Sequence, residues 1–413
     1  MLNTVINILT SLKLTVVTLC LSLVLVFVGT MAQDPLGLYI AQERFFHSLF
    51  VDGAAMKAGL EKTLQMVGVY VSAPTTGADV LSATRIPVFP GGYLLGGLLL
   101  VNLIAAHIKR FKFTKARSGI FLTHVGLILL LVGQLFTDVF STESTMRLEV
   151  GETRNYSEDS RKDELVFIDR SDPNHDAVIA IPAYRLKPGA VITHPDMPFK
   201  VKVHQFWKNA DIAGTAQPGF LKVDADKGIG PQVHVRELSA VTAMEQRNLP
   251  AAVIEVIKDD QPLGKWFTAL TLARTQSVPA GGKDWEFSLR FKRYYEPYTI
   301  TLLEAKHDKY KGTDIPRNFS SVVRVENPLT TENRETKIFM NNPLRYEGNT
   351  YYQYQMAADE MFLRPGETPT STLQIVQNPT WLTPYLGCLM VGLGLCIQFL
   401  IHLVKFARRR KTA

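Results

Sequence analysis

The sequence predicts an α-helical transmembrane protein with four spans and a large extracytoplasmic, mainly-β domain, built as a sandwich or an open barrel. Three observations predict this class. Four stretches of roughly twenty residues are nearly free of charge, which is the length that a helix needs to cross a bilayer. A polar segment between the third and fourth stretches is long enough to form a core of its own. That segment contains short alternating runs of β-branched and aromatic residues.

The four charge-free stretches divide the chain into three parts. They lie at about 14–32, 86–108, 118–137 and 381–404. We therefore expect residues 1–137 to contain three transmembrane helices, with an external loop at 33–85 and a basic link at 109–117. Residues 138–379 then form the β-rich domain, and residues 380–413 form the fourth span and a basic tail. A cleaved signal peptide is the alternative for the first stretch, because small residues end it.

Two basic clusters beside span ends predict the topology. Lysine and arginine gather in the link before the third span and in the tail after the fourth, where the positive-inside rule is strongest. We expect both clusters in the cytoplasm, and an even number of spans puts the N-terminus there too. The chain would then be a multi-pass protein of the cytoplasmic (inner) membrane. The clusters are Lys109, Arg110, Lys112, Lys115, Arg117, Lys405, Arg408, Arg409, Arg410 and Lys411.

Charge and cysteine content exclude several classes of function. The chain has 45 basic and 38 acidic residues, and without the ten residues of the two clusters 35 basic residues stand against 38 acidic ones. The basic balance therefore reflects topology, and we expect no nucleic-acid partner. Cys20, Cys388 and Cys396 all lie in predicted spans, so the external domain has no disulfide. Without CxxC or CxxCH, the chain is neither a common dithiol oxidoreductase nor a carrier of covalent haem.

Six segments of the external domain predict β-strands. Each is short, rich in β-branched or aromatic residues, and separated from the next by polar turn residues. The segments are FKVKVHQFW (199–207), AAVIEVI (251–257), WEFSLRFKRYY (285–295), YTITLLEA (298–305), SSVVRVE (320–326) and TYYQYQ (350–355). Short strands at this spacing are typical of a sandwich or an open barrel.

The third span contains the first candidate site residue, His124. It lies seven residues beyond Arg117, roughly 10 Å into the helix. Gly126 and Gly133 share one helix face, and His124 points about 160° away from it, so each face suits a different neighbour. An ionisable residue inside a span indicates a functional site, and neutral imidazole can bind haem iron. A hydrogen bond to a neighbouring helix is the alternative.

Two further histidines lie near the same predicted membrane face. His107 ends the second span and His402 lies near the end of the fourth. Either residue alone could simply meet lipid headgroups, but three histidines near one face favour a metal or haem site. The histidines of the external domain, His175, His194, His204, His234 and His307, form no HExxH or paired cysteine–histidine motif. No GxSxG, Walker or GxGxxG motif indicates a hydrolase or a nucleotide site.

Several stretches resemble the ResB family of cytochrome c biogenesis proteins (system II). GIFLTHVGLILLLVGQL (119–135) resembles the third span of that family. YKGTDIPRNFSSVVRV (310–325) and NNPLRYEGNTYYQYQ (341–355) carry the resemblance most specifically, and the second is similar to the family's Asn-x-Pro-Leu, Tyr-x-Gly and Tyr-Gln signature. Residues 11–33 and 377–395 are similar to the entrances of the first and last spans. The start of the second span, RIPVFPGGYLLGG (85–97), has no tryptophan, whereas this region is often aromatic in the family.

The resemblance implies a non-catalytic membrane subunit of a cytochrome c synthase complex. Its partner would be a ResC (CcsA)-like haem-handling membrane protein, and the pair would move haem b across the lipid bilayer and present it to apocytochrome c. His124 would be a transient axial ligand to the haem iron, with His107 and His402 as further candidates. No catalytic residue is implied. Two alternatives remain: a membrane b-type cytochrome, and a cofactor-free external assembly or sensor domain on a membrane anchor.

Overall fold

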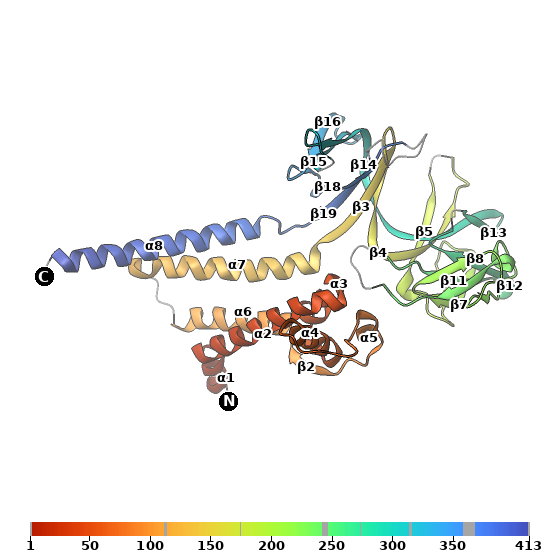
Figure 1. Cartoon of the computed structure of the whole chain (residues 1–413). Coiled ribbons are helices and arrows are strands. Elements are labelled where there is room, and N and C mark those ends of the chain that lie inside the picture. The colour runs from red at the N-terminus through yellow and green to blue at the C-terminus, as the bar shows by residue number, and fades with distance from the viewer. Residues whose placement is uncertain are drawn as a thin grey trace. The chain divides into compact units, whose positions relative to one another are not determined.

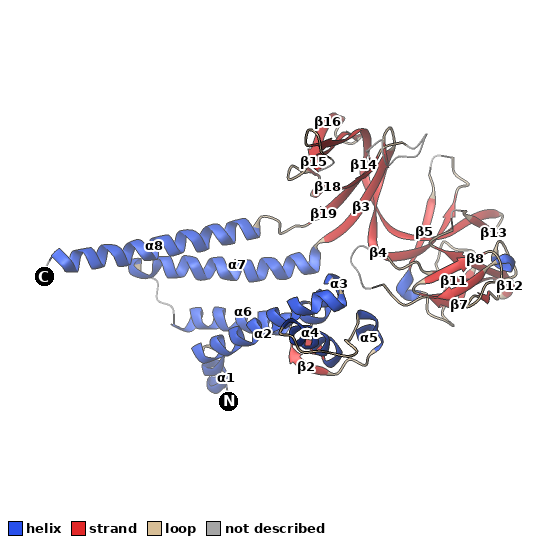
Figure 2. Ribbon diagram, in the orientation of Figure 1, coloured by secondary structure: helices blue, strands red, loops and turns tan. Residues whose placement is uncertain are grey.

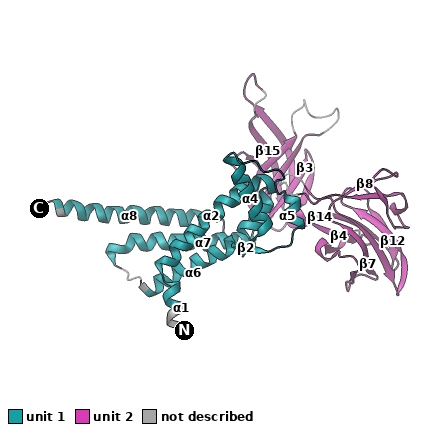
Figure 3. Ribbon diagram, turned by 60° about the horizontal axis from the view of Figure 1, so that its bottom comes forward, with its two compact units in different colours: residues 1–141, 242–246, 378–413 teal, residues 142–241, 247–377 magenta. Residues whose placement is uncertain are grey.

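The computed structural model describes residues 2–110, 114–173, 175–241, 247–272, 274–313, 316–357 and 368–411. The chain forms two compact units, which Figure 3 shows in different colours. The first unit comprises residues 1–141, 242–246 and 378–413, and the second comprises residues 142–241 and 247–377. Helices dominate the first unit and strands dominate the second (Figures 1 and 2).

Among the residues of the first unit that the structure describes, four helices are long and apolar enough to cross a membrane, which indicates a multi-pass membrane protein. They are α2 (Leu12–Leu36), α6 (Gly92–Arg110), α7 (Ser118–Phe140) and α8 (Thr383–Lys411), and a short helix, α1 (Leu2–Leu9), precedes them. The four predicted spans are thus confirmed as helices. The second begins later than predicted, because Pro87–Pro90 form a strand, β2, before it.

The residues between α2 and α6 form a small helical layer with one two-stranded sheet. Its elements are α3 (Leu38–Ala41), the π-helical turn η1 (Gln42–Phe46), β1 (Phe50–Asp52), α4 (Gly53–Met66) and α5 (Gly77–Ser82), and β1 pairs with β2. Arg44 and Asp52 form a buried ion pair at 3.0 Å. Asp52 also accepts a hydrogen bond from the N–H of Ala55 at the start of α4. The ion pair therefore connects η1 to the first turn of α4.

The glycine face of α7 packs against α8. A Cβ on Gly126 would lie 2.8 Å from the carbonyl oxygen of Gly387, and a Cβ on Gly119 would lie 2.5 Å from that of Gly394. Only glycine permits backbones to approach this closely, as in other small-residue helix interfaces. As the sequence predicts, the smooth face of α7 receives one neighbouring helix and His124 lies on the other side.

The second unit is an antiparallel β-domain with three sheets. The strands are β3 (Thr142–Glu149), β4 (Thr153–Asp169), β5 (Ala177–Pro182), β6 (Val191–Ile192), β7 (Lys200–Trp207), β8 (Ala210–Ala213), β9 (Leu221–Lys222), β10 (His234–Glu237), β11 (Ala251–Lys258), β12 (Gln261–Ala269), β13 (Gln276–Ala280), β14 (Lys283–Lys309), β15 (Pro316–Asn327), β16 (Glu332–Phe339), β17 (Leu344–Tyr346), β18 (Asn349–Ala357) and β19 (Thr370–Gln377). The largest sheet has ten strands, with β16-β15-β14-β4-β3-β19-β18-β17 in order, β5 beside β4 and β13 beside β14. It curls into a nearly closed barrel, which confirms the predicted architecture.

Two predicted strands, 285–295 and 298–305, are one continuous strand in the structure. Strand β14 runs from Lys283 to Lys309 and includes Pro297. Its pairing with β4 is irregular between Tyr295 and Ile300, so Pro297 lies at a bulge. A proline is tolerated there, because no ladder hydrogen bond is required from its missing N–H. The prediction of a break was therefore wrong.

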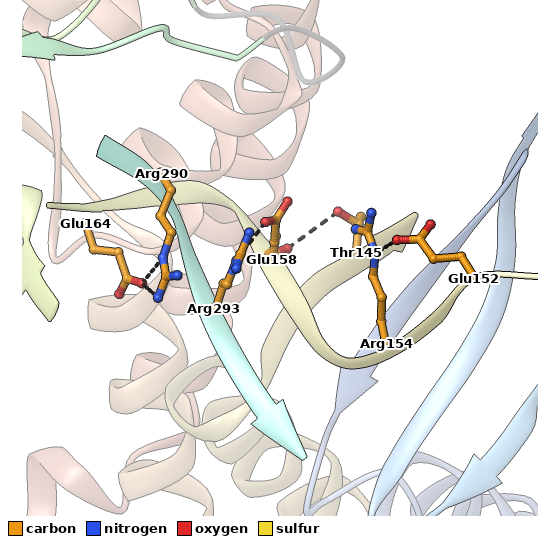
Figure 4. Close-up of polar contacts among 7 residues, drawn as sticks. All are labelled: Thr145, Glu152, Arg154, Glu158, Glu164, Arg290 and Arg293. Carbon is orange, nitrogen blue, oxygen red and sulfur yellow. Dashed lines mark hydrogen bonds and ion pairs between the residues drawn. The ribbon is translucent and has the colours of Figure 1, made fainter. Parts of the chain in front are cut away.

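Strands β4 and β14 are shared by two lobes of the β-domain. In one lobe, the end of β4 at Asp169 and the end of β14 at Lys283 pack against the sheet β12-β11-β7-β6. The core of this lobe includes Phe167 and Phe287. The other is the barrel, whose core includes Tyr298 and Tyr351. Figure 4 shows three ion pairs along these strands: Arg290 with Glu164 at 3.0 Å, Arg293 with Glu158 at 3.1 Å, and Arg154 with Glu152 at 2.5 Å. We call the stretch between the lobes, residues 159–163 and 291–295, the waist.

The barrel core contains a buried hydrogen-bond network. The hydroxyl oxygens of Tyr298 and Tyr351 lie 2.7 Å apart, and Nδ2 of Asn349 donates to Tyr298 at 3.0 Å. Nδ2 of Asn327 donates to the hydroxyl of Tyr346 at 3.0 Å. Buried polar groups must be paired, so this network specifies how the strands close the barrel.

Candidate functional site

His124 of α7 and His107 of α6 lie against each other. Their ring centroids are 4.6 Å apart, and the ring planes meet edge to face at 62°. The two helices follow one another along the chain, so residues near the two sides of the connecting link lie at a similar depth. The structure thus brings together two of the three predicted site residues.

Hydrogen bonds define the tautomer of both rings. Nδ1 of His124 lies 2.9 Å from the carbonyl oxygen of Ile120, and Nδ1 of His107 lies 3.1 Å from that of Leu103. A carbonyl oxygen only accepts, so Nδ1 donates in each case. In a neutral ring the lone pair is then on Nε2, which is the arrangement typical of metal-binding histidines. Both residues are partly exposed, but Nε2 of His107 is itself buried, so a ligand does not reach that atom while the helices stay in place.

The ring contact restricts the kind of haem site that these residues can make. Rings with centroids at 4.6 Å are in direct contact. A porphyrin therefore does not fit between His107 and His124 as they stand. If haem were bound at this position, at most one of the two rings could reach its iron while the rings are in contact. A haem held between both rings would require α6 and α7 to separate.

His402 does not join this pair. It lies on α8, where its Nε2 is 2.9 Å from Nε2 of Gln398. Because α8 packs on the glycine face of α7, His402 and His124 lie on opposite sides of that helix. In the part of the chain that the structure describes, no ring contact links His402 to His107 or His124. Among the same residues, no group of three histidine, cysteine or acidic side chains has the geometry of a metal site.

The helix that carries His107 is anchored one and a half turns earlier. Asn102 is buried, and its Nδ2 donates to the carbonyl oxygen of Leu9 at 2.7 Å. Its Oδ1 accepts a 2.6 Å hydrogen bond from the hydroxyl of Thr15. These bonds attach α6 to the break between α1 and α2. They set the rotation of α6 and thereby the direction of His107.

Basic residues lie at the same end of α6 and α7 as the histidine pair. Nζ of Lys109 donates to Oδ1 of Asn7 at 2.6 Å, and Lys115 and Arg117 are exposed at the start of α7. Such side chains suit the carboxylates of an anionic ligand. Lys112 and the side chains of Arg110, Arg409 and Lys411 lie outside the described residues.

Sequence reasoning missed His47, which follows η1. Its Nδ1 lies 3.3 Å from Oε1 of Glu43, and its Nε2 lies 3.2 Å from Oδ1 of Asp138 on α7. The ring also stacks on Tyr93 of α6, with centroids 5.9 Å apart. The spacing of Glu43 and His47, four residues apart, was visible in the sequence. Asp138 is 91 residues away along the chain, and no local pattern connects it to His47.

The other external histidines stay apart, as their scattered positions predict. Three of them pair with a nearby acid: His204 with Glu255 at 2.9 Å, His194 with Asp196 at 3.6 Å, and His175 with Asp172 at 3.7 Å. His234 lies on β10, and His307 lies on β14 with its ring stacked on Phe319. Local pairing or packing thus accounts for His175, His194, His204 and His307.

Comparison with known protein families and with curated proteins finds no match to this chain. The resemblance to the ResB family therefore rests on the residues that show it. One of them, His124, lies in the histidine pair. Others, Tyr346, Asn349 and Tyr351, lie in the barrel core, where they have a structural role.

Proposed function

We propose that the chain is the membrane subunit of a complex that moves haem across the membrane and supports its ligation to apocytochrome c. The proposal rests on the contact between His107 and His124, with Nδ1 of each ring bound to its own helix. This arrangement directs Nε2, the usual ligand atom, away from the helix backbone. The resemblance of the third span to the ResB family supports the same role.

The chemistry of haem fits this end of α6 and α7. Haem is largely apolar and carries two propionates, so its ring suits a position between helices while its carboxylates suit basic side chains. Lys109, Lys115 and Arg117 lie at that end. Haem b would be bound transiently, as cargo, with the ring among the helices and the propionates toward these residues.

His124 is the ligand that we assign to the iron. His124 lies further from the start of α7 than His107 lies from the end of α6. It would therefore suit the iron of a porphyrin between the helices rather than the propionates at their ends. Since the contact with His107 leaves no room for a porphyrin, the second axial ligand would come from a ResC (CcsA)-like partner. His107 would orient the ring of His124 until haem arrives.

The same proposal fixes the orientation in the membrane. Both termini and the basic link would lie in the cytoplasm, and the β-domain would lie outside the inner membrane. Haem would then meet the histidine pair near the cytoplasmic face, and the β-domain would meet the partner or apocytochrome c. This direction agrees with outward delivery.

An absorption spectrum of the purified protein tests the proposal. We expect a Soret band when the chain is purified with its partner, and we expect His124→Ala to lower it. Stable b-type haem in the chain alone would instead support an electron-transfer cytochrome. Absence of haem under both conditions would support an external assembly or sensor domain on an anchor. Either of the last two results would overturn the proposal.

A further inference from the structure

His47 connects α6 and α7 at the end opposite to the His107–His124 pair. Tyr93 precedes His107 by 14 residues, and Asp138 follows His124 by 14 residues. On a helix this separation corresponds to about 21 Å. The two helices thus have a histidine junction at each end. Between these ends, α7 packs far more extensively against α8 than against α6.

The ring of His47 lies between two carboxylates. Asp138 of α7 is 3.2 Å from Nε2, and Glu43 of η1 is 3.3 Å from Nδ1. Tyr93 of α6 stacks on the ring with the two planes inclined by 14°. Arg44, the other charged side chain of η1, pairs with Asp52 instead. Glu43, Tyr93 and Asp138 are therefore the titratable groups that face His47 from the three elements around it.

This arrangement needs two ring protons. Carboxylate oxygens only accept, whereas a neutral imidazole has a single N–H. With one proton, the ring would turn a lone pair toward one of the two acids. With two protons, each nitrogen presents an N–H, and the positive charge attracts both carboxylates. The contact with both carboxylates therefore depends on whether the ring carries its second proton.

We propose that His47 is a proton-dependent latch that holds the adjoining ends of α6 and α7 together. The latch is closed when the ring carries two protons. It opens when the ring releases one proton to water, since one carboxylate then loses its donor. The closed state holds one proton more than the open state, so a higher pH favours opening. This inference does not rest on haem transport.

Exposure of the three side chains suits such a latch. His47 is 32% exposed, so its proton can exchange with water. Asp138 is only 15% exposed, and its attraction to the ring is therefore less screened than that of a surface pair. Glu43 is 49% exposed and contributes less. The contact with Asp138, which joins η1 to α7, is thus the main bond of the latch.

Distance measurements on the full chain test the latch. Leu49 and Val139 are 59% and 60% exposed and flank His47 and Asp138. Spin labels on Leu49→Cys and Val139→Cys, with Cys20, Cys388 and Cys396 changed to alanine, report the separation of the two segments. We expect a narrow distance distribution at about pH 5 and a broader, longer one at about pH 8. An unchanged distribution would overturn the proposal.

Three variants separate the latch from other effects of pH. His47→Arg keeps a charged donor for both acids at every pH, so the distribution should stay narrow. His47→Gln has no charge and should give the broad distribution at both pH values. His194→Gln, which removes a histidine beside Asp196 in the β-domain, is the matched control and should respond as the native chain does. A native pH response in His47→Gln, or broadening at high pH in His47→Arg, would refute the latch.

Discussion

The hydroxyl group of Tyr294 donates a 2.8 Å hydrogen bond to Oδ2 of Asp159 at the waist of the β-domain. Oδ1 of the same carboxylate accepts from the N–H groups of Arg161 and Lys162. Asp163 lies four residues further along β4. Burial, followed by the nearby charge of Asp159, raises the pKa of Asp163 to about 7. At the waist, Asp159 thus accepts hydrogen bonds at both carboxylate oxygens, whereas Asp163 has a raised pKa.

The raised pKa of Asp163 predicts that stability decreases as pH rises. In the unfolded chain its pKa returns to the usual value of 3.8, so the folded chain holds this proton more tightly. The contribution of Asp163 to the free energy of unfolding is therefore highest below about pH 4, and it decreases as the pH rises to about 7. Asp163→Asn should raise Tm at about pH 8 and change it little at about pH 4. Asp284→Asn, at an exposed position on β14, is the control for thermal unfolding followed by circular dichroism. A native pH slope in Asp163→Asn would contradict the prediction.

Tyr351→Phe should destabilise the barrel. The change removes the hydroxyl that lies 2.7 Å from that of Tyr298, and the remaining buried hydroxyl loses a partner. The expected loss in the free energy of unfolding is about 1–2 kcal/mol. Tyr352→Phe, at an exposed position on the same strand, should change it by less than about 0.5 kcal/mol. Chemical denaturation of the two variants measures the difference, and equal effects would argue against the buried network.

Gly126→Ala should weaken the contact between α7 and α8. The new methyl group would lie 2.8 Å from a carbonyl oxygen and 2.9 Å from Val391, so the helices must move apart. Gly392→Ala is the matched control, because no atom lies within 4 Å of the new Cβ and alanine favours a helix. Thermal unfolding in detergent should show a lower Tm for the first variant only. A Tm for Gly126→Ala equal to that of Gly392→Ala would speak against close packing.

Three histidine variants should differ in haem handling. His124→Ala should abolish cytochrome c maturation and lower the haem that copurifies with the complex, and added imidazole should restore part of it. His107→Ala should have an intermediate effect, because it removes the ring that orients His124. His402→Ala should be nearly silent, since it pairs with Gln398 on the far side of α7. Maturation assays with a membrane-insertion control measure this order. Normal maturation in His124→Ala would remove the case for iron ligation.

Reporter fusions should show the proposed topology. A reporter after Ala413 or within the basic link should be active as a cytoplasmic fusion, and one inserted beside Gly281 should be active outside. Gly281 lies in the turn between β13 and β14, where an insertion disturbs little of the fold. An external signal from the C-terminus would reverse the orientation, and the proposed direction of haem delivery with it.

Helical spans and the direction of His124 were predictable because both depend on local pattern. Twenty uncharged residues suffice to indicate a span, and a rotation of about 100° per residue separates His124 from Gly126 and Gly133. Local pattern does not show which helix packs against each face of α7. The contacts of α7 with α8 and with His107 depend on how the helices assemble, and no periodicity in α7 encodes them.

Long-range partners explain the remaining differences between prediction and structure. Pro297 looked like a strand boundary, but irregular pairing with β4 places it at a bulge. His47 was not singled out in the sequence, because its main partner, Asp138, belongs to α7 and lies 91 residues further along the chain. Strands of two residues, such as β6 and β9, are too short to show alternation.

The pairing of β3 with β19 has a consequence for folding of the nascent chain. Thr142, the first residue of the β-domain, lies opposite Gln377, the last, so the sheet joins segments more than two hundred residues apart. Closing so long a loop is entropically costly and slow. Until the ribosome has produced Thr370–Gln377, one edge of β3 lacks its partner and can pair with a strand of another chain. A transcript that ends before Thr370 should therefore yield a product that aggregates rather than one that lacks only its last helix.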